Sequence, residues 1–193
     1  MMEVTRPSSP LAPVRALMPP RPLTPSEARH VIERQTTRLL KLCDIAGPPV
    51  PVEAITRQLP RIEVRRFAEL PTSGRTQWNG SRWVILVAMD EATVRQRFSV
   101  AHELAHIVFH PLSDTAIPAY GEVTAEARLE SACEYFAACL LMPRLWMKRA
   151  YYDDGMQDVA SLAHLFNVSQ VAMRVRMEQL AFVPSTFSSR SAA

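Results

Sequence analysis

The segment RFSVAHELAHIVFH, residues 97–110, constrains the fold more than any other part of the sequence. It places His102 and His106 four residues apart, with Glu103 between them. On an α-helix, residues four apart lie on one face, so both imidazoles can reach one metal ion. Glu103 is rotated by about 100° from His102 around the helix axis, so it can border the metal without binding it. This spacing is typical of zinc peptidases that use the glutamate as a general base, although two histidines on an ordinary helix have the same pattern.

A catalytic zinc site needs a third protein ligand, which this helix does not supply. His110 continues the face of His102, but it lies about 12 Å away because a helix rises about 1.5 Å per residue. That distance is too long for two ligands of one ion. The third ligand must therefore come from another segment.

The next predicted helix offers carboxylates at four successive turns: Glu122, Glu126, Glu130 and Glu134. Like charges at this spacing destabilise a helix unless solvent, a nearby arginine or a cation offsets the repulsion. The first two lie near the helix N-terminus, where the helix dipole favours negative charge and a solvated face is sufficient. The last two lie among apolar residues, so either Glu130 or Glu134 is a candidate for the third ligand.

Two stretches of the sequence match a known pattern, RFSVAHELAH at residues 97–106 and ESACEYFAACLLMP at residues 130–143. They resemble the ImmA/IrrE family of zinc metallopeptidases, which reads R-F-T-x-A-H-E-x-G-H and then E-x-x-A-N-x-F-A-A-x-L-L-M-P. The resemblance extends more loosely upstream, to the short helix that begins near residue 52, and downstream to about residue 181.

The resemblance implies that Glu130 is the third metal ligand, with His102 and His106. The chain departs from the family pattern at Ala105, where the family has Gly, and at Glu134, where it has Asn. Glu134 is expected to hydrogen-bond a ligating histidine or to compete with Glu130 as the ligand. The implied cofactor is Zn²⁺, with Mn²⁺ as an alternative in the cell.

The implied chemistry is peptide hydrolysis with Glu103 as the general base. A further donor to the oxyanion is expected from one of four side chains, among which the sequence does not choose: Tyr120, Tyr151, Tyr152 and His164. The resemblance implies a protein substrate, a helix-turn-helix transcriptional repressor that is cleaved to release its genes during stress or mobile-element induction.

The C-terminal segment over 158–181 supports a different function, because its residues 158–180, DVASLAHLFNVSQVAMRVRMEQL, resemble a helix-turn-helix with Asn167 at the turn. The alternative is a DNA-binding or protein-interaction regulator with a structural or vestigial metal site. However, Arg174 and Arg176 are balanced by Asp158 and Glu178. DNA binding needs a surplus of cations to neutralise phosphates, so the sequence argues against direct DNA contact.

The order of predicted elements indicates an α+β fold, with strands early and helices late. A small antiparallel or mixed sheet is expected to pack on the active-site helix, as in zincins, with a mainly helical C-terminal half. The predicted division is a disordered, proline-rich tail over 1–25, a metallopeptidase domain over 26–181 and a second disordered tail over 182–193. Along the chain, the patterns predict a helix from Thr24 to Gly47, a short helix over 52–59, strands over 62–67 and 83–87, a hairpin turn at Asn79-Gly80, helices over 91–109 and 122–141, a loop over 112–121, a turn over 151–155, and helices over 158–166 and 169–181.

The three cysteines are an odd number, and the first 25 residues lack the apolar core of a signal peptide. Both features predict reduced thiols and a cytoplasmic location. No apolar run approaches the length of a membrane span. The net charge of +3 is too small to indicate a nucleic-acid partner.

Overall fold

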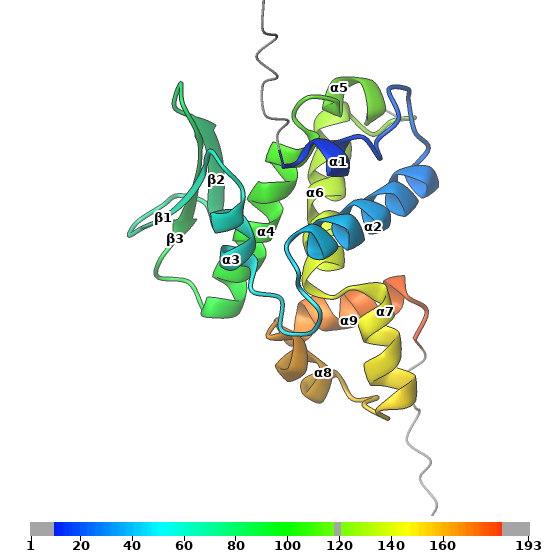
Figure 1. Ribbon diagram of the computed structural model, residues 1–193. Coiled ribbons are helices and arrows are strands. Elements are labelled where there is room, and N and C mark those ends of the chain that lie inside the picture. The colour runs from blue at the N-terminus through cyan, green and yellow to red at the C-terminus, as the bar shows by residue number, and fades with distance from the viewer. Residues whose placement is uncertain (1–9, 118–120, 183–193) are drawn as a thin grey trace, which may run out of the picture.

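The computed structural model describes residues 10–117 and 121–182, which form one small sheet and a larger set of helices (Figure 1). The strands are β1 (Ile62–Phe67), β2 (Gly74–Trp78) and β3 (Trp83–Ala88). The helices are α1 (Ala12–Arg15), α2 (Pro25–Leu42), α3 (Val52–Gln58), α4 (Thr93–Phe109), α5 (Ser113–Ala116), α6 (Ala125–Leu141), α7 (Arg144–Lys148), the π-helix η1 (Arg149–Asp153), α8 (Val159–Phe166) and α9 (Gln170–Gln179). The predicted α+β class is confirmed, with the strands early and the C-terminal half helical.

The sheet is mixed, with the strand order β1-β3-β2. β3 pairs in parallel with β1 and antiparallel with β2. The apolar run 84–88 is buried, which fits its central position in the sheet. The predicted turn at Asn79-Gly80 joins β2 to β3, and the Asn79 N–H donates to the Arg82 carbonyl. β2 itself has the sequence GRTQW, whose polar residues suit the edge strand that it forms.

The helix α4 lies between the sheet and the pair of helices α2 and α6 (Figure 1). Most of α4 is buried, and Ala101 and Ala105 are fully enclosed. Small side chains at these positions allow neighbouring elements to approach α4 closely. The helix ends at Phe109, just before Pro111, which cannot donate a backbone hydrogen bond. The two histidines are thus held on a rigid element at the centre of the fold.

The helix α6 begins at a polar cap and then becomes apolar. The Thr124 hydroxyl accepts from the Ala127 N–H at the N-terminus. Further along, Cys133, Phe136 and Leu140 are fully buried. No helix in the described part of the chain is long and apolar enough to span a membrane.

The predicted disordered tail over 1–25 is wrong for residues 10–25, which pack against the domain. Leu11, Val14 and Met18 are buried. The Arg15 guanidinium donates to the Ile107 carbonyl at 2.7 Å and to the Val108 carbonyl at 3.3 Å, near the C-terminal end of α4. The prolines prevent a long helix in this segment but allow the single helical turn α1. The apolar residues in and around this turn reach the core. Residues 1–9 lie outside the described ranges.

Two other stretches contain more helix than predicted. The one-turn helix α5 lies in the predicted loop, and η1 includes residues of the predicted turn over 151–155. Downstream, Asn167 adopts the left-handed conformation between α8 and α9, with φ 51° and ψ 57°. It therefore takes the turn position predicted for it, because Asn tolerates this conformation better than most residues. Of the predicted C-terminal tail, only Phe182 is described, and it is buried.

Candidate metal centre

His102 and His106 lie one turn apart on α4 and present their Nε2 atoms to the same space. The two Nε2 atoms are 3.2 Å apart. Each side chain is partly buried, with 18% and 24% of its surface exposed. Burial lowers the pKa of both imidazoles, although the nearby Glu130 carboxylate acts in the opposite direction. Burial thus favours the neutral imidazole, which is the form that binds metals.

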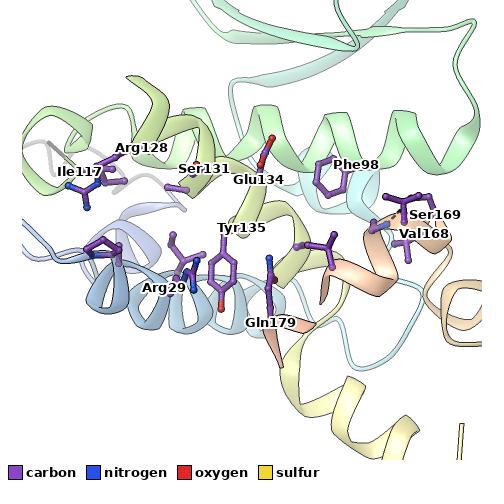
Figure 2. Close-up of a pocket in the computed structure, with 18 of the residues that line it drawn as sticks. Arg29, Phe98, Ile117, Arg128, Ser131, Glu134, Tyr135, Val168, Ser169 and Gln179 are labelled. Carbon is purple, nitrogen blue, oxygen red and sulfur yellow. Dashed lines mark hydrogen bonds between the residues drawn. The ribbon is translucent and has the colours of Figure 1, made fainter. Parts of the chain in front are cut away.

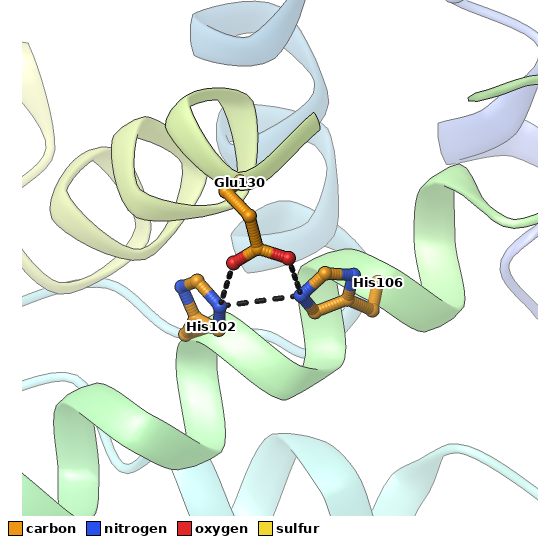
Figure 3. A group of neighbouring side chains, drawn as sticks. All are labelled: His102, His106 and Glu130. Carbon is orange, nitrogen blue, oxygen red and sulfur yellow. Dashed lines mark hydrogen bonds and ion pairs between the residues drawn. The ribbon is translucent and has the colours of Figure 1, made fainter. Parts of the chain in front are cut away.

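Glu130 reaches the same space from α6, the neighbouring helix (Figure 3). Its Oε2 atom is 3.3 Å from His102 Nε2, and its Oε1 atom is 3.4 Å from His106 Nε2. One donor atom from each of the three side chains lies within 4.8 Å of the other two. The packing of α4 against α6 therefore joins residues that are more than twenty positions apart in the sequence.

The donor atoms of the three side chains are close enough to share one metal ion. Ligands at about 2.0–2.1 Å from a tetrahedral zinc ion lie about 3.3–3.4 Å from one another. The two histidine Nε2 atoms, 3.2 Å apart, are close to that value, and each of them faces a different oxygen of the Glu130 carboxylate, at 3.3 and 3.4 Å. Two imidazoles and one carboxylate are also a donor set that catalytic zinc sites use, with the fourth position left for a reactant.

Glu103 is buried beside the two histidines and faces the edge strand β2. The Thr76 hydroxyl on β2 donates to the Glu103 backbone carbonyl at 3.3 Å. Burial raises the pKa of the Glu103 carboxyl above its usual value, and hydrogen bonding from Thr76 partly opposes this effect. A raised pKa suits a group that must take up and release a proton near neutral pH.

Because Gly74 has no side chain, there is room beside it for the side chain of Glu103. A β-carbon at Gly74 would lie 3.1 Å from both the Cγ and the Oε1 of Glu103, and 3.3 Å from the Ser99 Cβ. These distances are shorter than ordinary van der Waals contacts. The sequence marks Gly74 only as a turn signal, and nothing in its local pattern connects it with Glu103.

A cavity of about 460 Å³ opens over these residues. Its walls include Thr76 and Trp83 from the sheet, and Leu129 from α6. His110 also lines the cavity, with its ring 5.0 Å from the Trp83 ring in an edge-to-face contact. In the described part of the chain, His110 does not join the group of clustered donor atoms, in keeping with its distance along the helix. The sequence alone did not connect Thr76 or Trp83 with this site.

Glu134 lies one turn beyond Glu130 on α6 but outside the donor cluster. It is exposed and faces a different groove. Among the hydrogen bonds of the described residues, none joins Glu134 to His102 or His106. Four residues advance a helix by about 6 Å and rotate it by about 40°, which is enough to carry Glu134 past the histidines. Glu134 affects the site only through its charge, which favours protonation of His102.

Three of the four expected oxyanion donors lie away from the cavity over the histidines. Tyr151 is buried and packs on Phe182, with ring centroids 4.6 Å apart. Tyr152 and His164 are exposed, and none of these three side chains lines the cavity over the histidines. Tyr120 lies outside the described residues.

Comparisons with known proteins give the family and the fold of the chain. The family model for the IrrE N-terminal-like domain, a peptidase family, matches residues 57–178. A solved structure of a Mycobacterium tuberculosis transcriptional regulator superposes with a TM-score of 0.65 at 19% sequence identity. That match covers 88% of this chain and 51% of the regulator, so the chain spans about half the length of that protein. No curated protein matched the chain. The family match includes both α4 and α6, and the chain belongs to the IrrE N-terminal-like family.

Proposed function

We propose that the protein is a zinc-dependent endopeptidase whose metal is held by His102, His106 and Glu130. The observation that supports this most strongly is that two imidazole nitrogens, 3.2 Å apart, and one carboxylate meet in the same space, which is a donor set that catalytic zinc sites use. When bound, zinc supplies Lewis-acid polarisation of the scissile carbonyl group. Mn²⁺ is the alternative ion in the cell, because carboxylate and imidazole ligands also accept it.

Glu103 acts as the general base in this proposal. Its carboxylate accepts a proton from the attacking water as the water oxygen bonds to the carbonyl carbon. Glu103 then returns that proton to the amide nitrogen as the carbon–nitrogen bond breaks. Its burial and its raised pKa support both steps, because the carboxyl group can hold the proton between them.

The outer edge of β2, which pairs with no further strand among the described residues, supports binding of the substrate as an extended strand. β2 is an edge strand, and its residues Gly74 and Thr76 line the cavity over the histidines. A strand that pairs with an exposed sheet edge gains main-chain hydrogen bonds that do not depend on its sequence. We therefore propose that the peptide around the scissile bond lies along β2.

The proposed substrate is a helix-turn-helix transcriptional repressor, and the proposed setting is gene regulation during stress or mobile-element induction. Support for this class comes from membership of the IrrE N-terminal-like family. We propose a cytoplasmic location, in keeping with the three buried cysteines, Cys43, Cys133 and Cys139, which are all free thiols.

A DNA-binding regulator that uses α8 and α9 is the second candidate, favoured by the left-handed turn at Asn167 between the two helices. The charge of this segment argues against it. Arg176 is fully buried and donates to Glu33 at 2.9 Å, so it cannot reach a phosphate. Salt-dependent binding of the chain to duplex DNA is the measurement that would establish this candidate.

A substrate trap tests the peptidase proposal. The Glu103→Gln variant, purified from its native cell, is expected to bind zinc and to retain a helix-turn-helix protein that wild-type enzyme cleaves in vitro. Glu122→Gln removes an exposed carboxylate from the turn before α6 and serves as the control, with activity unchanged. Full cleavage by Glu103→Gln would contradict the role of this residue. Recovery of no helix-turn-helix protein would contradict the proposed substrate class.

A further inference from the structure

A second and larger hollow lies next to the metal centre, and the peptidase reaction does not account for it. This helix groove has a volume of about 610 Å³ and is formed by α2, α4, α6 and α9 (Figure 2). Its apolar lining includes Ile32, Phe98 and Ala138. The volume lies in the range of clefts that bind ligands. The groove is therefore large enough to receive side chains from another molecule.

One wall of the helix groove carries two apolar side chains that are exposed to solvent. Val171 is 68% exposed and Val175 is 46% exposed, one turn apart on α9. Both line the groove, as does Phe98 on α4. Exposed apolar residues that gather along a concave surface are typical of sites where a partner binds.

The charge of the helix groove favours an acidic partner. Arg29 and Arg95 are exposed on its walls, whereas Glu134 is the exposed carboxylate that lines it. Arg95 lies 3.8 Å from Glu91. Among the ion pairs of the described residues, none involves Arg29, whose guanidinium lies over the Tyr135 ring at 5.7 Å from the centroid. Arg29 is thus available to pair with a carboxylate on a bound molecule.

The helix groove and the metal centre lie one turn apart along two helices. On α4, Phe98 in the groove is one turn before His102, and on α6, Glu134 in the groove is one turn after Glu130. One such turn is about 6 Å long. A protein segment bound in the groove is therefore connected by a short extended stretch to the site of cleavage.

The lining indicates which secondary structure fits. Most of the lining residues lie on helices, a few lie in the segments that connect them, and the strands of the sheet do not line the groove. An extended segment would find no strand with which to pair, and its buried N–H and C=O groups would be left without partners. A helix satisfies its own backbone groups and can insert side chains spaced three and four residues apart between the helices.

We propose that the helix groove binds an amphipathic helix of the protein substrate, with its apolar face towards Phe98, Val171 and Val175 and a carboxylate paired with Arg29. This inference rests on the proposed peptidase function. It assigns substrate selection to a surface outside the metal centre. Short peptides that lack the helix would then be poor substrates, because they bind only at the cavity.

Two synthetic helical peptides of 18 residues serve as the probe. Both have leucines spaced three and four residues apart, and their polar faces carry glutamate in one and lysine in the other. Fluorescence anisotropy measures their binding to the zinc-loaded, full-length Glu103→Gln protein at low salt. The acidic peptide is expected to bind about fivefold or more tightly than the basic one, the effect of about one exposed ion pair.

Matched variants locate the binding site of the probe. Arg29→Glu is expected to weaken binding of the acidic peptide about fivefold, whereas Arg38→Glu, an exposed change on the same helix but outside the groove, leaves it unaltered. Val171→Asp is expected to weaken binding by about tenfold or more, since it removes an apolar contact. Leu145→Asp, at a residue that is 71% exposed on α7, is its control.

Several results would overturn the proposal. One is that the acidic peptide does not bind, and another is that both peptides bind equally and Val171→Asp does not change their binding. A third is that the protein forms a dimer in solution that Val171→Asp dissociates, because a second copy of the chain would then occupy the groove. Tighter probe binding after removal of residues 183–193 would also overturn it, because the chain's own end would then be the occupant. Binding is measured in a variant that cannot cleave. An empty groove would therefore leave the peptidase function intact, and an inactive wild-type enzyme would not by itself contradict docking.

Discussion

At the scale of single residues, local sequence patterns predict some side chains of the candidate site but not others. The spacing of His102, Glu103 and His106 predicts one helical face, and the structure has it. The choice between Glu130 and Glu134 needs the packing angle of α6 on α4, which local patterns do not contain. The structure brings Glu130 to the histidines and turns Glu134 towards the helix groove.

Gly74 provides a prediction at this scale. In Gly74→Ala the new β-carbon would lie 3.1 Å from the Glu103 side chain, so the carboxylate must shift by a few tenths of an ångström. Turnover of the trapped substrate is expected to fall about tenfold, with KM and zinc content unchanged, because small displacements of a catalytic group reduce the rate. Steady-state kinetics and metal analysis measure these effects.

Gly47→Ala is the matched control, since a β-carbon at Gly47 would meet no atom within 4 Å. It should turn over at the wild-type rate. Equal turnover by the two variants would show that Gly74 does not position Glu103.

At the scale of elements, the sequence predicts the strongly patterned segments and misses those whose form depends on their neighbours. The capping box of α2 is present, with the Thr24 N–H donating to Glu27 at 2.9 Å. β2 is polar and short, so only its pairing with β3 makes it a strand. The segment at residues 10–23 contains many prolines, which predicted disorder, but its apolar residues and Arg15 bind it to the end of α4.

The packing of this N-terminal segment leads to a prediction about stability. Val14 is fully buried, so Val14→Asp places a carboxylate in an apolar site and should destabilise the protein by about 3 kcal/mol. For a chain of this size, the expected fall in Tm is about 6–12 °C. Calorimetry or circular dichroism measures this change.

The neighbouring exposed Pro13 supplies the control, since Pro13→Asp should change Tm by no more than about 2 °C. If Val14→Asp melted at the wild-type temperature, the segment would not be part of the core.

At the scale of the whole molecule, the cavity of the candidate metal centre and the helix groove lie on adjoining surfaces. The two hollows follow one another along α4, because Phe98 lines the helix groove and His102, one turn later, lines the cavity. The cavity holds the proposed catalytic residues, and the groove is proposed to select the substrate. Both depend on the same contact between α4 and α6, which brings together parts of the chain that the sequence connects only through a family resemblance.

The zinc content of two variants on α6 tests the central claim, that this contact completes a metal centre. Wild-type protein, dialysed against metal-free buffer and analysed by mass spectrometry, is expected to retain about one zinc ion per chain. Glu130→Ala should lose most of it, because two histidines alone bind zinc weakly, whereas Glu134→Ala should retain it. Full zinc occupancy in Glu130→Ala, or its loss only in Glu134→Ala, would contradict the assignment of Glu130 as the third ligand.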